Sequence, residues 1–87
     1  MTRVAAVDCG TNSIRLLICE VQEDGKIRDI VRTMEIVRLG QGVDATGEFA
    51  AEALERTRVA LEGYVQQMKF ENVKRVRMVA KIGRAHV

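Results

Sequence analysis

The first 38 positions alternate between short apolar runs and polar turns. Residues 3–8 form a short apolar run with β-branched valines, and residues 14–22 and 26–38 carry similar runs with charged residues interleaved. Runs of this length and composition are typical of β-strands. "EDG" at 23–25 is a turn signal, because Gly25 can adopt a positive φ. The pattern therefore predicts an antiparallel meander of three strands joined by two tight turns.

After residue 38 the pattern changes. Residues 39–49, "LGQGVDATGEF", hold three glycines and no apolar period, which indicates a loop. From Ala50 to Lys69 a predicted helix has one apolar face, made by Ala50, Ala53, Leu54, Thr57, Leu61, Tyr64, Val65 and Met68. Ala50 is a poor N-cap because it has no side-chain acceptor. Residues 73–80, "VKRVRMVA", read as a fourth strand, which after a crossover helix is most simply parallel to an earlier one.

Composition narrows the class of protein. The chain has 87 residues, 47% of them hydrophobic and 30% charged, which fits one small globular α/β domain. A net charge of +2 and three aromatic residues (one Tyr, two Phe) argue against a nucleic-acid partner. No apolar run approaches the roughly 20 residues that span a bilayer. Asp8 and Asn12 interrupt the first apolar stretch, so we expect no signal peptide, no membrane partner and a cytoplasmic location.

The two cysteines, Cys9 and Cys19, lie in or beside predicted strands. In a reducing compartment, buried thiols are the simplest interpretation of cysteines at such positions. A disulfide between them, or a reactive thiol, is the less favoured alternative.

The C-terminal residues 81–87, "KIGRAHV", do not continue the pattern. The nucleotides ATC GGA AGA GCA CAC GTC encode Ile-Gly-Arg-Ala-His-Val, and this string resembles a widely used short-read sequencing adapter. We therefore expect the natural sequence to end near Ala80 or Lys81 and residues 81–87 to be a non-native tail. His86, the single histidine, then has no functional role.

Candidate chemistry is concentrated in "DCGTNS", residues 8–13. Asp8 ends the first strand, Gly10 allows a sharp turn, and the next three residues offer two hydroxyls and an amide beside backbone N–H groups. Such a turn suits a phosphate, and the carboxylate suits a hydrated cation. Arg15 lies on the same face of the second strand as Ser13 and can add positive charge. The alternative is a plain hairpin turn whose polar side chains satisfy the backbone.

The stretch "VAAVDCGTNSIRLLI" (4–18) resembles the first phosphate-binding hairpin of the Ppx/GppA family, the exopolyphosphatases and guanosine pentaphosphate phosphohydrolases. The family pattern Asp-x-Gly-[Ser/Thr]-Asn-Ser, followed closely by a basic residue, is matched at Asp8, Gly10, Thr11, Asn12, Ser13 and Arg15. "MEIVRLGQGVDATGEFAAEALERTRVAL" is similar to the family's third strand, glycine loop and first helix. Residues 73–80 are similar to the strand before its next functional loop, so the resemblance covers residues 1–80.

The resemblance implies a partial actin-like, ribonuclease-H-like ATPase fold in the order β-β-β-α-β. Strands one to three would be antiparallel and strand four parallel to strand one. Residues 1–80 would be the N-terminal part of the first of two such domains, and the full-length protein a homodimer. The hairpin would bind phosphates of polyphosphate or of guanosine penta- or tetraphosphate through Gly10, Thr11, Asn12, Ser13 and Arg15. Asp8 would help hold Mg²⁺ while an activated water hydrolyses the terminal phosphate.

The resemblance also shows what residues 1–80 lack. In the family, a loop of the type Ala-Thr-Ser-Ala-x-Arg, a catalytic glutamate and a second glycine-rich phosphate loop all come later. We therefore expect no catalytic residue in this fragment and no activity from it alone. Arg38, Gly40 and Gly42 are a possible loop contribution to anion binding, although the glycines also suit a simple strand-to-helix connection. Two alternatives stay open: a fragment of a sugar- or acetate-kinase-like ATPase, and a non-catalytic phosphate-binding module.

Overall fold

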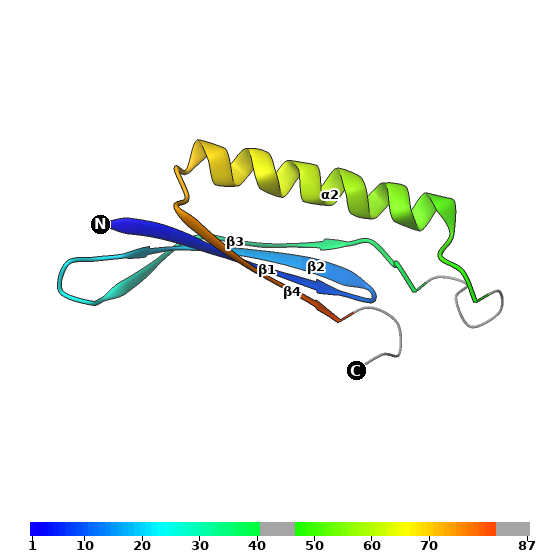
Figure 1. The fold of residues 1–87 in the computed structure, drawn as a ribbon, viewed down its shortest axis with the longest axis horizontal. Helices are drawn as coiled ribbons and strands as arrows, with labels where there is room; N and C mark the ends of the chain where they lie inside the picture. Colours follow the sequence, from blue (N-terminus) through cyan, green and yellow to red (C-terminus); the bar gives the residue numbers. More distant parts are fainter. Residues whose placement is uncertain (41–46, 82–87) are drawn as a thin grey trace.

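The structure, a computed structural model, describes residues 1–40 and 47–81. They form a β-sheet with one long helix packed on one of its faces (Figure 1). The elements in chain order are β1 (Thr2–Gly10), β2 (Ser13–Val21), β3 (Ile27–Ile36), α2 (Ala51–Phe70) and β4 (Arg75–Lys81). The predicted order β-β-β-α-β is confirmed. The predicted contribution of Gly42 and the predictions for residues 82–87, His86 among them, lie outside the described residues.

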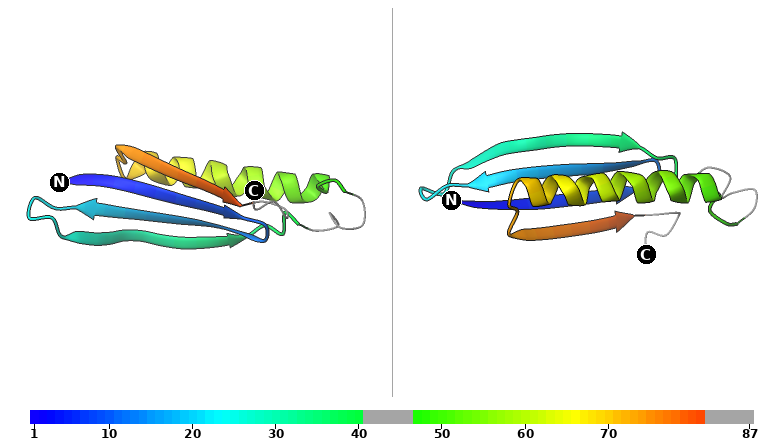
Figure 2. Two further views of the ribbon diagram at one scale, coloured as in Figure 1. Left: turned by 60° about the horizontal axis from the view of Figure 1, so that its bottom comes forward. Right: turned by 90° about the horizontal axis from the view of Figure 1, so that it is seen from above.

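The four strands form one mixed sheet in the order β3-β2-β1-β4. β1 pairs antiparallel with β2 and parallel with β4, and β2 pairs antiparallel with β3. Figure 2 shows β3 and β4 at the two edges, with α2 lying over the sheet and running roughly along its strands. A return through a helix is what allows β4 to run parallel to β1. The predicted mixed sheet, with strand four parallel to strand one, is therefore confirmed.

The core lies between the sheet and α2. In β1, Ala5, Val7 and Cys9 are buried, whereas the alternate residues Ala6 and Asp8 are exposed. Because side chains alternate along a strand, this pattern places one face of β1 under the helix and leaves the other open. The remaining buried hydrophobic residues come from β2, from the segment after β3 and from the helix: Ile14, Leu16, Ile18, Val37, Leu39, Ala53 and Tyr64.

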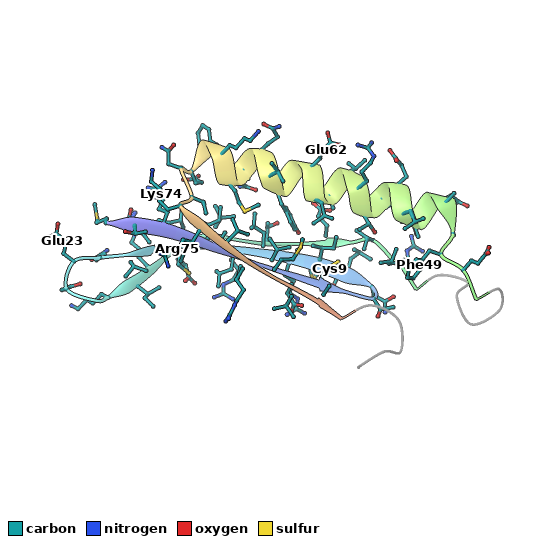
Figure 3. The ribbon with its side chains drawn as sticks, viewed as in Figure 1. Cys9, Glu23, Phe49, Glu62, Lys74 and Arg75 are labelled. Atoms are coloured by element: carbon teal, nitrogen blue, oxygen red, sulfur yellow. The ribbon has the colours of Figure 1, made fainter. Side chains whose placement is uncertain are left out.

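Helix α2 presents a narrower apolar face than the sequence predicts. Leu54 and Val65 were expected on the face toward the sheet, but they are 48% and 43% exposed. The buried positions are Ala53 and Tyr64, because one straight helix contacts a sheet along a narrow stripe. The predicted weak start is confirmed, since Ala50 makes no side-chain capping bond. On the solvent side, Glu62 points away from the sheet (Figure 3).

Arg3 joins the end of α2 to the sheet. Its Nε lies 3.3 Å from Oε2 of Glu20, and its Nη1 bonds the side chain and the carbonyl of Glu71. Glu20 is the one charged residue that is buried among the described residues. Buried charges require partners, so this pairing is needed for the fold to tolerate Glu20 there. The amide of Lys74 donates to the carbonyl of Arg3 at 2.8 Å, which fixes where β4 begins.

In residues 1–40 and 47–81, no helix combines the length and the apolar composition that crossing a membrane requires.

Candidate functional site

Residues Thr11 and Asn12 form a two-residue turn between β1 and β2. This turn lies at the same end of the sheet as the C-terminal end of β3 and the start of α2 (Figure 1). The polar stretch 8–13 of the sequence is therefore a hairpin end, as predicted. Two other segments of the chain approach it there.

The carbonyl groups of the turn are occupied by the segment after β3. The amides of Val37 and Arg38 donate to the carbonyl of Asn12 at 2.9 and 3.0 Å, and the amide of Gly40 donates to the carbonyl of Thr11 at 3.0 Å. All peptide bonds here are trans, so the C=O and N–H of one peptide unit point in opposite directions. The N–H groups of Asn12 and Ser13 are therefore directed away from residues 37–40. The carbonyls of Thr11 and Asn12 are therefore kept for the protein.

Gly40 is required by its contact with the turn. A Cβ at this position would lie 2.5 Å from Cγ2 of Thr11, which is too close for any side chain without a shift of the threonine or of the backbone. Gly40 thus lets the backbone of residues 37–40 approach the turn closely. Gly40 thus packs against the turn and Arg38 is exposed next to it, and their contribution to anion binding stays a prediction.

Arg38 has a left-handed backbone with φ of 49°. A non-glycine residue in this region is uncommon and needs support from its surroundings. Here the amide of Arg38 donates to Asn12, and its carbonyl accepts from Nη2 of Arg56 at 3.5 Å. The strained residue is therefore held from both sides.

Asp8 and Arg15 lie directly opposite each other in the β1–β2 ladder. Both are exposed, on the face of the sheet that α2 does not cover, where they line a shallow depression with Leu17, Arg32 and Met34. Ser13 and Arg15 share a face of β2, as predicted, because they are two residues apart. Positive and negative charge thus adjoin on the uncovered face, close to the turn.

The residues described here can supply one carboxylate to a cation at this end of the sheet. In the part of the chain that the structure describes, no group of three or more His, Cys, Asp or Glu side chains gathers at one point. Mg²⁺ is commonly held by one or two carboxylates, with substrate phosphates and water completing the shell. Asp8 can serve as the single protein carboxylate in a Mg²⁺ site of this kind. Arg15, opposite on the same face, competes with a cation for this carboxylate.

Two residues of α2, Arg56 and Tyr64, form hydrogen bonds to backbone carbonyls at this end of the sheet. The sequence alone did not predict these bonds. Nε of Arg56 donates to the carbonyl of Val37 at 2.8 Å. The hydroxyl of Tyr64 donates to the carbonyl of Ile14, one residue after Ser13, at 2.7 Å. Burial raises the pKa of Tyr64, and the charge of Glu35 raises it further, so the phenol keeps its proton. A sequence signal existed: Arg56 and Tyr64 fall three to four residues from Ala53 and Ala60 on the buried stripe.

The thiol of Cys9 is a core group. Cys9 is 4% exposed, and burial raises its pKa, with a further contribution from the charge of Asp8. Cys19 is partly buried and lies 3.6 Å from Oδ1 of Asp29. Both cysteines are free thiols, and the preferred interpretation of a buried thiol is confirmed for Cys9, whereas Cys19 is only partly buried.

Comparison with known proteins identifies the chain. The family model described as "Ppx/GppA phosphatase family" matches residues 17–86. The chain belongs to the Ppx/GppA phosphatase family. The matched range begins after the hairpin turn; it confirms the predicted family and decides against a sugar- or acetate-kinase-like fragment.

Relatives and solved structures of the Ppx/GppA family agree. The chain is 59% identical over 83 residues to "Exopolyphosphatase 2" of Mycobacterium tuberculosis, which covers 92% of this chain and 26% of that protein. A crystal structure of the Aquifex aeolicus family member superimposes with a TM-score of 0.87 at 35% identity, covering 91% of this chain and 26% of that one. A Cytophaga hutchinsonii exopolyphosphatase gives a TM-score of 0.81 at 27% identity, covering 88% and 24%.

The chain thus spans about a quarter of the length of the curated relatives it matches, 26% in the case of the Mycobacterium tuberculosis protein. Within that quarter it has the family's sheet and helix, which makes it a partial actin-like ATPase fold.

Proposed function

We propose that this chain is the N-terminal phosphate-binding part of a Ppx/GppA phosphohydrolase that removes terminal phosphate from polyphosphate or guanosine pentaphosphate. Residues 1–80 would be the first part of the first actin-like domain, and residues 81–87 a non-native tail. One observation carries the proposal: residues 37–40 occupy the carbonyls of Thr11 and Asn12, so these acceptors do not oppose an anion at the turn. Neutral donors aimed at one point are what a phosphate requires.

The residues of the turn would divide the work. The backbone at Gly10 and the donors of Thr11, Asn12 and Ser13 would contact phosphate oxygens. Arg15 would add a charge-assisted hydrogen bond from the uncovered face. Asp8 would hold Mg²⁺, which when bound neutralises phosphate charge, and Arg38 would add positive charge at the rim.

The water-activating base and the second phosphate loop lie outside residues 1–80 in this proposal. Hydrolysis requires a positioned nucleophile and charge neutralisation beyond a phosphate clamp. The 87-residue chain therefore binds phosphate chains without cleaving them. For the full-length protein we propose a cytoplasmic location and a homodimer, and we place polyphosphate before the guanosine nucleotide because the similar Mycobacterium tuberculosis protein is named an exopolyphosphatase.

A titration with tripolyphosphate, with and without Mg²⁺, tests the binding step. In ¹⁵N-labelled chain we expect the largest shifts at the amides of Asn12 and Ser13. Asn12→Ala and Ser13→Ala should each weaken binding about tenfold, the expected effect of losing one hydrogen bond to a charged group. Gln66→Ala is the matched control, because Gln66 is an exposed amide on α2 away from the turn.

The same variants placed in the full-length protein extend the test to turnover. Asn12→Ala and Ser13→Ala should lower phosphate release from polyphosphate, while Gln66→Ala should not. Full activity and unchanged binding in both turn variants would show that residues 8–13 are only a hairpin. Binding with no turnover in the full-length protein would favour the non-catalytic module.

A further inference from the structure

Arg56 reaches from α2 to two consecutive carbonyls of the segment after β3. Its Nε lies 2.8 Å from the carbonyl oxygen of Val37, and its Nη2 lies 3.5 Å from that of Arg38. In extended backbone, consecutive carbonyls point to opposite sides of the chain. The left-handed φ of 49° at Arg38 changes this alternation and brings both carbonyls within reach of one guanidinium.

The same segment holds the turn. The amides of Val37, Arg38 and Gly40 donate to the carbonyls of Asn12 and Thr11. Because the C=O and N–H of one peptide unit lie in one plane, the direction of the C=O also sets the direction of the N–H. The guanidinium of Arg56 thus holds the backbone of residues 37 and 38 in place. Their amides in turn hold the carbonyl of Asn12, and this sets the orientation of the peptide unit between Asn12 and Ser13.

We propose that Arg56 is a positioning residue for the phosphate-binding turn, an inference that rests on the function proposed above. Arg56 does not touch the ligand. It keeps Arg38 in its left-handed conformation and so keeps residues 37–40 bonded to the carbonyls of Thr11 and Asn12. A lysine at 56 carries the same charge but lacks the planar fork that meets two carbonyls at once.

The chain offers a close control. Arg58 is on the same helix, two residues further on, but it is exposed and pairs with Glu55 and Glu62 on the solvent side. Arg56→Gln and Arg58→Gln remove the same charge from the same helix. Only the first removes donors from residues 37 and 38.

Two measurements on the four variants Arg56→Gln, Arg56→Lys, Arg58→Gln and Arg58→Lys test the proposal. The first is hydrogen exchange at the amides of Arg38 and Gly40, with Leu16 in the β2 ladder as the internal reference. The second is the dissociation constant for tripolyphosphate. In Arg56→Gln we expect exchange at 38 and 40 and the dissociation constant each to rise about tenfold, as for one lost hydrogen bond to a charged group. Arg56→Lys should fall between wild type and Arg56→Gln, and both Arg58 variants should stay within about twofold of wild type.

Equal exchange and equal affinity in Arg56→Gln and Arg58→Gln would overturn the proposal. So would a rise in exchange at Leu16 as large as that at Arg38 and Gly40, because Arg56 would then stabilise the whole fold and not the turn. If Arg56→Gln does not fold, the same comparison is made between Arg56→Lys and Arg58→Lys. If wild-type chain does not bind tripolyphosphate, the proposed function fails, and the exchange rates alone confirm or overturn Arg56 as the residue that holds the turn.

Discussion

The two hairpins of this sheet are held in different ways. The hairpin between β2 and β3 closes on itself: the amide of Gly25 donates to the carbonyl of Gln22, the amide of Gln22 to that of Lys26, and the amide of Lys26 to Oδ1 of Asp24. In the hairpin between β1 and β2, the two turn carbonyls instead accept hydrogen bonds from amides of residues 37–40. The first turn is specified by its own five residues, and the second by residues distant in the chain, at Val37–Gly40, Arg56 and Tyr64.

Under the proposed function, this difference matches what each end of the sheet has to do. A turn that satisfies its own backbone needs only the right local sequence, and Asp24-Gly25 supplies it with φ of 86° at the glycine. A turn that is to present donors to a ligand must have its acceptors satisfied from elsewhere. The β1–β2 turn therefore depends on the tertiary structure, and variants at the two turns should behave differently.

The largest effect should come from Gly40→Ala. The new Cβ would meet Cγ2 of Thr11 at 2.5 Å, so we expect a loss of about 2 kcal/mol in the free energy of unfolding, typical of overpacking at a close contact. Urea denaturation measures it. Thr11→Ser removes Cγ2 and keeps the hydroxyl, so the double variant Thr11→Ser/Gly40→Ala should recover most of the loss. No recovery would mean that the glycine is needed for another reason.

Tyr64→Phe should cost somewhat less. Removing the hydroxyl leaves the buried carbonyl of Ile14 without this donor, at a cost of about 1.5 kcal/mol in the free energy of unfolding. The loss should be accompanied by faster hydrogen exchange near Ser13 and Ile14. Unchanged stability would show that this bond contributes nothing net to the fold.

The same variant tests a pH dependence. Burial raises the pKa of Tyr64 in the folded chain above its value of about 10 in the unfolded chain. Its contribution to stability is therefore complete below pH of about 10 and is lost as the pH rises through the folded pKa. Wild type should lose more stability than Tyr64→Phe between pH 9 and pH 11, where these bounds are set by the ordinary tyrosine pKa of about 10. Parallel losses in the two proteins would contradict this assignment.

Gly25→Ala tests the turn between β2 and β3, whose hydrogen bonds are all made among residues 22–26. Alanine at φ of 86° is strained even though no atom lies within 4 Å of the added Cβ, so we expect a loss of about 1 kcal/mol. Gly25→Asn should lose less, because asparagine tolerates the left-handed region. Affinity for tripolyphosphate should be unchanged in both. A weaker affinity would show that the two ends of the sheet are coupled.

Gly63→Ala should have the smallest effect and the opposite sign. Gly63 is in the interior of α2, and an added Cβ there meets no atom within 4 Å. Higher helix propensity should raise the free energy of unfolding by about 0.8 kcal/mol. The same substitution thus stabilises the helix and destabilises the contact at Gly40. A loss of stability at Gly63 would remove the contrast between these two positions.

The sequence predicts the elements well because their signals are local. Period-two burial in β1 and β2, the Asp24-Gly25 turn and the spacing of apolar residues in α2 are each visible within a few residues. The Asp8–Arg15 stretch and its family resemblance placed the candidate site at the hairpin between β1 and β2. The partners of this stretch are not local, and the sequence alone did not predict them.

Arg56 shows why. Its spacing from Ala53 and Ala60 places Arg56 beside the buried stripe of the helix, but nothing in the sequence shows which backbone groups it bonds. Its role follows from the crossing of α2 over the sheet, which brings it within 2.8 Å of a carbonyl 19 residues earlier in the chain. The predicted apolar face of the helix was too broad for the same reason. How α2 packs on the sheet determines which of its residues are buried, and this packing leaves Leu54 and Val65 exposed.

The pairing of β2 with β3 has a consequence for insertions and deletions. β2 has 9 residues and β3 has 10, and Ile30 is the extra residue, because Ile18 pairs with Val31 while Cys19 pairs with Asp29. One end of this ladder is set by the turn at 22–26, and the other by the bonds from residues 37–40 to Thr11 and Asn12. Added residues near Asp24 lengthen an exposed turn and leave both ends in place. An added residue between Val31 and Val37 would shift Gly40 away from Thr11. Changes of length should therefore be tolerated at the turn between β2 and β3 but not between Val31 and Val37.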